Sequence, residues 1–218
     1  METKDIDFSK LSPMMKQYFE VKNKYKNHIL FYRLGDFYEM FFDDAIIASR
    51  ELELTLTGRD CGLEERAPMC GVPHHACDVY LKKLIEKGYN VAICEQTMDP
   101  AMCKGIVPRE VIRVVTPGTL IESSMLDETS NNYICAFYMR AKESALCLAD
   151  ISTGEVHLFE FEGKEMTSSA INELSRFSPA EILINDAFLS NKELSSFIRE
   201  KLKTSVQLLE ENDFSPEI

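Results

Sequence analysis

Phe37 and Glu39 are the residues whose types and spacing could do chemistry on a ligand. Residues 29–32 just before them are aliphatic or aromatic, which predicts a strand. Gly35-Asp36 then interrupts this strand, because Gly tolerates an unusual φ and Asp can cap a helix. Apolar residues at helical spacing follow, so we expect Phe37 and Glu39 to project from a strand-to-helix corner.

Two interpretations of this pair remain open from residue type alone. In the first, Phe37 is buried in the core and Glu39 is an exposed acid in the first turn of the helix, since aromatic side chains are usually buried. In the second, the aromatic ring is a wedge and the carboxyl is a hydrogen-bonding partner, both aimed at a ligand.

Four separated motifs carry a family resemblance. They read FYRLGDFYE at 31–39, GVPHHA at 71–76, AICEQ at 92–96 and VTPGT at 115–119. In this order they resemble the MutS family of DNA mismatch-repair proteins, and four motifs are far more specific than one Phe-x-Glu.

The resemblance implies a role for each residue of the pair. Phe37 would enter mismatched duplex DNA from the minor groove and stack on a mispaired or unpaired base. Unstacking a base step costs a few kcal/mol, and the cost is lowest where pairing is already defective. Glu39 would hydrogen-bond the displaced base, and a protonated carboxyl could donate to a purine N7.

The same resemblance places further residues near DNA. These expected contacts are Leu34, Gly35, Asp36, Tyr38, Arg59, Met69, Lys104 and Arg109. Tyr38 fits a core position better than a contact, and a solvated surface role is an equal alternative for the last four, which we expect in loops.

Composition limits the class of protein. The 218 residues are 45% hydrophobic and contain neither a long apolar run nor a signal peptide. Seven scattered cysteines fit reduced thiols in the cytoplasm. Net charge is −12, with 16 Lys and Arg against 18 Asp and Glu in residues 1–116 and 8 against 18 in residues 117–218. The near-neutral first half could read DNA locally but would grip phosphates weakly.

The pattern of elements predicts two α/β domains. The first, residues 1–116, is a mixed-sheet mismatch-recognition domain. A linker follows at 117–131, and a connector domain at 132–218 continues beyond the chain in the family. Within the first domain we expect a helix opened by Ser12 and Pro13, strands at 53–57, 90–95 and 110–116, a connector at 68–73 and a helix at 74–87.

The second domain begins with three strands on short turns. These cover 133–139, 145–151 and 155–161, with a hairpin signal at 152–154. Helices at 166–177 and after Asn185 then alternate with strands at 181–184 and 206–209. This order resembles the ribonuclease-H-like layout of the MutS connector. Asp150 ends a strand where a nuclease would place a metal-binding acid, but a turn acid fits better because partner acids are not evident.

Catalytic motifs are not found in the sequence. The spacing of four potential zinc ligands, Cys70, His74, His75 and Cys77, fits no common zinc-binding pattern. The sequence also contains no phosphate-binding Gly-rich loop and no nucleophile elbow. We therefore expect a binding protein that is not an enzyme and has no metal or cofactor; the family's ATP and Mg²⁺ belong to a domain absent here.

Partners follow from the resemblance. They are mismatched duplex DNA and a MutL-type protein that docks on the connector, with homodimerisation in the full-length family and a monomeric chain here. A pure protein-docking module and a nuclease built on Asp150 remain as alternatives.

Overall fold

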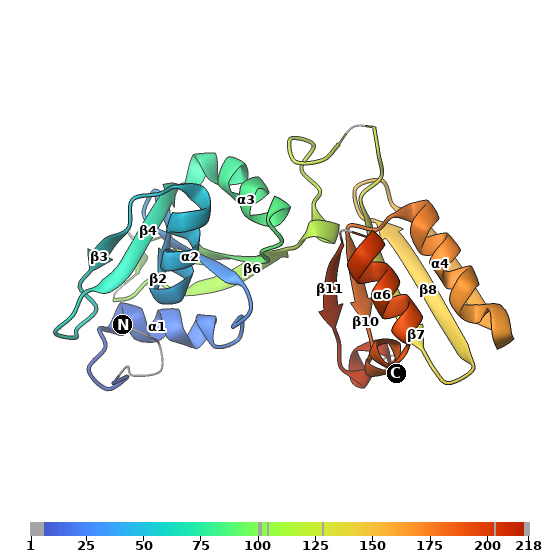
Figure 1. Ribbon diagram of the computed structural model, residues 1–218. Coiled ribbons are helices and arrows are strands. Elements are labelled where there is room, and N and C mark those ends of the chain that lie inside the picture. Colours follow the sequence, from blue (N-terminus) through green and yellow to red (C-terminus); the bar gives the residue numbers. More distant parts are fainter. Residues whose placement is uncertain (1–6, 100–101, 104, 128, 203, 216–218) are drawn as a thin grey trace. The chain divides into compact units, whose positions relative to one another are not determined.

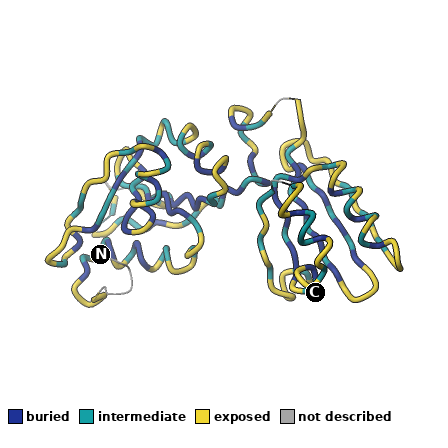
Figure 2. Tube along the Cα trace, in the orientation of Figure 1, coloured by how far each residue is buried: buried dark blue, intermediate teal, exposed yellow. Residues whose placement is uncertain are grey.

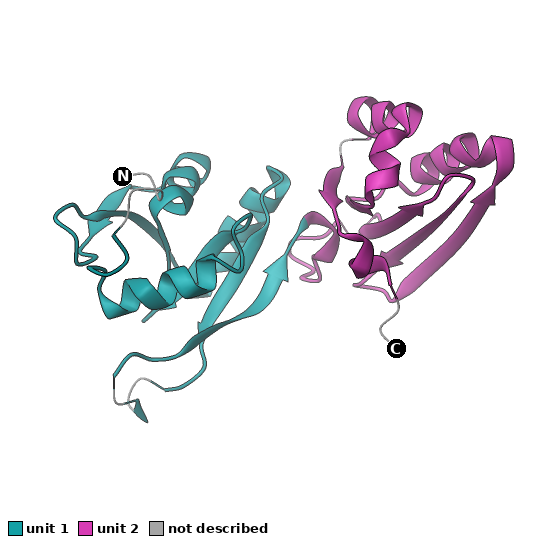
Figure 3. Cartoon of the chain, turned by 90° about the horizontal axis from the view of Figure 1, so that it is seen from below, with its two compact units in different colours: residues 1–116 teal, residues 117–218 magenta. Residues whose placement is uncertain are grey.

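The computed structural model describes residues 7–215 except 100–101, 104, 128 and 203. The chain forms two compact units, with the boundary between Thr116 and Pro117 (Figure 3). Both units are mixed α/β, as the fold class predicted. None of the described helices is long and apolar enough to span a membrane.

The first unit is built on a six-stranded mixed sheet in the order β3-β4-β2-β1-β5-β6 (Figure 1). The strands are β1 Ile29–Leu34, β2 Phe37–Phe41, β3 Thr57–Arg59, β4 Ala67–Pro73, β5 Val91–Gln96 and β6 Arg109–Val115; the helices are α1 Pro13–Lys22, α2 Phe42–Leu52 and α3 Cys77–Glu86. Strand β1 pairs parallel with β5 and antiparallel with β2, and the central strands are mostly buried (Figure 2).

Helices cover both faces of this sheet. Tyr18 of α1 packs edge-on against Tyr32 and Phe41, which lie on one face. On the other face the Cys70 thiol lies 3.5 Å from the Ala45 carbonyl of α2. As predicted, the Ser12 hydroxyl caps α1 by accepting a hydrogen bond from the Met15 N–H.

The predicted strand-to-helix corner is wrong, because Gly35-Asp36 turns β1 back into β2 as an antiparallel hairpin. Asp36 therefore caps no helix; α2 begins only at Phe42 and has no side-chain cap. The local sequence is ambiguous because Phe37 to Phe41 fits a helix as well as a strand. Pairing with β1 on one side and β4 on the other decides for the strand.

Two neighbouring expectations also need correction. The strand predicted at 53–57 is shifted to β3, because Glu53 adopts a left-handed conformation that ends α2. The predicted connector at 68–73 is strand β4, which pairs with both β3 and β2. The helix predicted at 74–87 is present as a 3₁₀ turn, His74–Ala76, followed by α3.

The second unit has a five-stranded sheet in the order β11-β10-β7-β8-β9. Three antiparallel strands are followed by two parallel ones, as the ribonuclease-H-like layout predicts. The strands are β7 Tyr133–Met139, β8 Glu143–Asp150, β9 Glu155–Glu162, β10 Glu181–Ile184 and β11 Ser205–Leu208, with helices α4 Met166–Phe177, α5 Asp186–Ser190 and α6 Lys192–Lys201. Alternate residues of β7 and β8 form one core with all three helices.

Part of the expected linker packs against the second unit. The Gly118 N–H donates to the Glu181 carboxylate at 3.0 Å. A Cβ at Gly118 would lie 2.8 Å from Cβ of Ile134, so only glycine fits this contact.

Candidate nucleic-acid interface

A tight turn holds the tip of the β1–β2 hairpin. Gly35 has a φ of +56°, in the left-handed region, whereas the φ of Asp36 lies outside that region. This is the pattern of a type II′ turn with Gly in the first central position. The Asp36 carbonyl accepts a hydrogen bond of 2.9 Å from the His74 N–H, which ties the turn to the end of β4. The GVPHHA motif therefore has a structural role in fixing this turn.

Phe37 is the first residue of β2 and its side chain lies at this tip. It is 47% exposed, in contrast to the fully buried Phe31 and Phe41. In register it lies between Leu34 of β1 and Pro73 of β4. An exposed aromatic on a tied turn is positioned to contact a ligand, and the alternative interpretation, in which Phe37 is buried in the core, is wrong.

Glu39 lies on the same face as Phe37, because side chains two residues apart in a strand share a face. Its carboxylate forms an ion pair with the Arg59 guanidinium of β3, and its side chain is only 15% exposed. The residue of β4 opposite Glu39 is Gly71, where an added Cβ would lie 3.4 Å from Cγ of Glu39.

The strand registers bring several predicted contact residues to one face. Residues that alternate along a strand, or that are paired across two strands, share a face of the sheet. Five predicted contact residues therefore point to the side that α1 partly covers: Leu34, Phe37, Glu39, Met69 and Arg59. Met69 and Arg59 belong to strands and not to loops, and both are half-buried. Gly35 and Asp36 are exposed at the turn.

Tyr38 points to the opposite face and is buried, in line with the core alternative. Its hydroxyl bonds the Glu95 carboxylate, which also pairs with Arg33 at 3.2 Å. Burial and this hydrogen bond raise the pKa of Tyr38 well above its usual value. Glu95 and Arg33 were not among the predicted site residues, although both lie in the motifs that carry the resemblance.

The predicted loop position of Arg109 is wrong, because Arg109 is buried in β6. Its guanidinium donates to the Arg33 carbonyl at 2.7 Å, the Gln17 amide oxygen at 3.0 Å and the Val107 carbonyl at 2.9 Å. It also lies over the Tyr32 ring. These contacts tie β6 to α1 and β1, so the side chain cannot reach DNA without leaving the core.

Lys104, the last predicted contact, lies outside the described residues. The hairpin tip of the first unit thus brings together the exposed Phe37 ring and the ion-paired Glu39 carboxylate.

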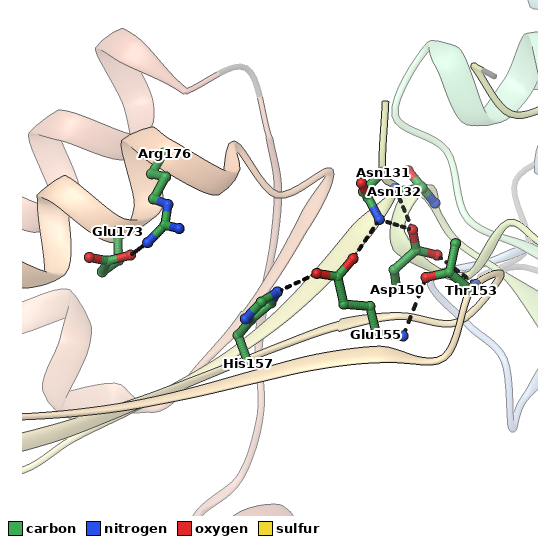
Figure 4. Close-up of polar contacts among 8 residues, drawn as sticks. All are labelled: Asn131, Asn132, Asp150, Thr153, Glu155, His157, Glu173 and Arg176. Carbon is green, nitrogen blue, oxygen red and sulfur yellow. Dashed lines mark hydrogen bonds and ion pairs between the residues drawn. The ribbon is translucent and has the colours of Figure 1, made fainter. Parts of the chain in front are cut away.

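Asp150 in the second unit is a turn acid (Figure 4). One carboxylate oxygen accepts from the Ser152 N–H at 2.9 Å and hydroxyl at 2.6 Å. The other accepts from the Asn131 amide at 2.9 Å, a contact that Figure 4 shows. Burial opposes ionisation of Asp150, but these hydrogen bonds outweigh it and lower the pKa. The Asn131 amide also reaches Glu155, which pairs with His157.

Metal-ligating residues are not grouped in the part of the chain that the structure describes: no three His, Cys, Asp or Glu side chains are placed to share an ion. Cys70 is buried and faces α2, and the Cys77 thiol lies 3.4 Å from Asp78.

The fold and the hairpin tip define a two-unit α/β protein in which the Phe37 ring is exposed beside the paired Glu39 carboxylate. The family model for MutS domain I matches residues 12–124, and that for MutS domain II matches residues 132–217. The chain belongs to the MutS family.

Curated relatives agree with this assignment. The DNA mismatch repair protein MutS of Ruminiclostridium cellulolyticum is 52% identical over 204 residues, covering 94% of this chain and 23% of that protein. The MutS of Acetivibrio thermocellus is 50% identical over 95% of this chain and 24% of its own length, and that of Clostridium perfringens is 56% identical over 82% and 20%. The chain therefore spans about a quarter of the length of these relatives.

Proposed function

We propose that the first unit recognises mispaired or unpaired bases in duplex DNA. Phe37 enters the base stack from the minor groove, and Glu39 hydrogen-bonds the base that the ring displaces. The observation that carries this proposal is the half-exposed Phe37 ring on a turn tied to β4. Family membership supports the same reading.

Recognition of this kind does not depend on the base sequence. The ring costs unstacking energy wherever it enters, and that cost is lowest at a defective pair, so discrimination comes from DNA deformability. Stacking of an aromatic side chain on a base contributes about 1–3 kcal/mol and tolerates every base. One residue can therefore serve many mismatches.

Electrostatics at the tip favour weak backbone binding. Asp36 is exposed there, and Glu39 is neutralised by Arg59. Residues 1–116 are close to neutral overall, so they would release few counterions from DNA. We expect these 218 residues alone to bind DNA weakly; ATP and Mg²⁺ would act through a domain outside them.

The test is fluorescence anisotropy of the chain at low salt with three duplexes: G·T-mismatched, unpaired-thymine and matched. We expect tighter binding to the first two, and loss of that preference in Phe37→Ala. Equal affinity of the unsubstituted chain for all three duplexes would overturn the proposal.

Glu39→Gln tests the second half of the proposal. An amide can donate a hydrogen bond but carries no charge, so we expect this variant to retain mismatch binding and to bind matched DNA better. If Glu39→Gln loses mismatch binding as completely as Phe37→Ala, a neutral donor at this position is not what the base requires.

The second unit is a candidate docking surface for a MutL-type partner. Strand β9 is at the edge of its sheet, and Val156 and Leu158 on its outer face are 62% and 67% exposed. Exposed apolar residues on an edge strand favour contact with another protein. In a pull-down, purified MutL-type protein should still be captured by the Phe37→Ala variant and should not be captured by Leu158→Glu. The reverse result would exclude docking through β9.

A further inference from the structure

The Glu39–Arg59 ion pair controls what both residues can do, and this inference rests on the proposed function. Within the described residues the Arg59 guanidinium is the polar partner of the Glu39 carboxylate. The pair spans β4, which lies between β3 and β2 in the sheet. Gly71, the residue of β4 opposite Glu39, has no side chain to cover the carboxylate, and Arg59 reaches it from a position opposite Ala67.

While the pair is closed, the Glu39 carboxylate is occupied, and it offsets the positive charge that Arg59 could offer to a phosphate. A base that approaches Glu39 must compete with a guanidinium for the carboxylate. A phosphate that approaches Arg59 meets a guanidinium that already donates to the Glu39 carboxylate through Nη1. The Arg59 side chain is 37% exposed, so a phosphate can reach it without rearrangement of the fold.

We propose that mismatch binding exchanges this ion pair for two new contacts. Glu39 turns to the displaced base, and Arg59, released from Glu39, binds a backbone phosphate. On matched DNA no base is displaced, so the pair stays closed and the phosphate contact does not form. Arg59 is thus a positioning residue for Glu39, and its phosphate contact is conditional on a mismatch.

The exchange predicts a difference in salt dependence. Each protein–phosphate contact adds about 0.9 to the slope of log affinity against log salt. In this protein, Arg59→Met should lower the slope by about 0.9 on an unpaired-thymine duplex and leave the slope on a matched duplex unchanged. Between 50 and 200 mM salt this slope corresponds to about 3.5-fold in affinity.

Three variants serve as comparisons. Arg59→Lys keeps a cation and should retain the slope on the unpaired-thymine duplex. Arg66→Met removes the same charge from an exposed position near β3 and should not change the two slopes differently. Glu39→Gln removes the negative charge that holds Arg59, so the slope on matched DNA should rise toward that on the unpaired-thymine duplex.

Each other outcome overturns the exchange. If Arg59→Met lowers both slopes equally, Arg59 is an unconditional phosphate contact. If neither slope changes, Arg59 meets no phosphate. Both results leave the proposed role of Phe37 unchanged. If the unsubstituted protein shows no mismatch preference, both the proposed function and the exchange are overturned.

Discussion

Replacing Phe37 by Ala removes the ring that the proposed function requires. Because the side chain is 47% exposed, its loss should cost the fold only about 1 kcal/mol, roughly half of what full burial of such a side chain contributes. In a mismatch complex the ring would be covered by bases, and stacking contributes about 2 kcal/mol. We therefore expect about 30-fold weaker binding to a duplex with an unpaired thymine.

Phe8→Ala is the matched control. Phe8 is 48% exposed in the same unit and packs edge-on against Phe19, which packs against Phe42 after the far end of β2. Anisotropy titrations should show the 30-fold loss only for Phe37→Ala, and neither variant should bind matched DNA differently. Thermal melts establish that both variants are folded. Undiminished mismatch preference in folded Phe37→Ala, or an equal loss in Phe8→Ala, would refute the reasoning.

Three further substitutions test the surroundings of the site and the second unit. Gly71→Ala places a methyl group 3.3 Å from the Tyr38 carbonyl and 3.4 Å from Cγ of Glu39, so mismatch preference measured by anisotropy should fall a few-fold. Arg109→Met removes the hydrogen bonds that the guanidinium donates to two part-buried carbonyls and to Gln17. It should destabilise the protein by about 2–3 kcal/mol in urea unfolding, with no change in the salt slope of DNA binding. Asp150→Asn should cost about 2 kcal/mol at pH 7. Because folding lowers the pKa of Asp150 below 3.8, its contribution is present above pH 3.8 and is lost as pH falls through the folded-state pKa, so the stability difference should vanish there.

Clear results would contradict each of these expectations. Gly71→Ala with full mismatch preference would mean that Glu39 has room to move. Stable Arg109→Met with a reduced salt slope would make Arg109 a DNA contact after all. A stability difference for Asp150→Asn that persists at a pH where Asp150 is protonated would mean that the lost hydrogen-bond acceptor, and not the charge, is its cause.

The sequence predicted the elements whose signals are local. The Ser12 cap, the edges of α4 and the Val- and Ile-rich strands depend on short-range propensity and alternation. The hairpin was missed because residues 37–41 suit either structure, and only pairing with β1 and β4 selects a strand. Phe37 and Glu39 share a face in the strand, so the error in local structure did not separate them.

Long-range contacts of the site could not be predicted. The Glu39–Arg59 pair depends on the strand order that places β4 between β2 and β3. The burial of Arg109 depends on Gln17, which is 92 positions away in the chain. Neither relation leaves a periodic signal in the sequence, since both arise from which strands become neighbours.

The insertion of the Phe37 ring is tested most directly by nuclear Overhauser effects between labelled Phe37 ring protons and an unpaired-thymine duplex. The account predicts contacts from the ring to minor-groove sugar protons at the unpaired base and none with the matched duplex. A bound complex in which the ring contacts only the major groove, or contacts no DNA, would contradict it.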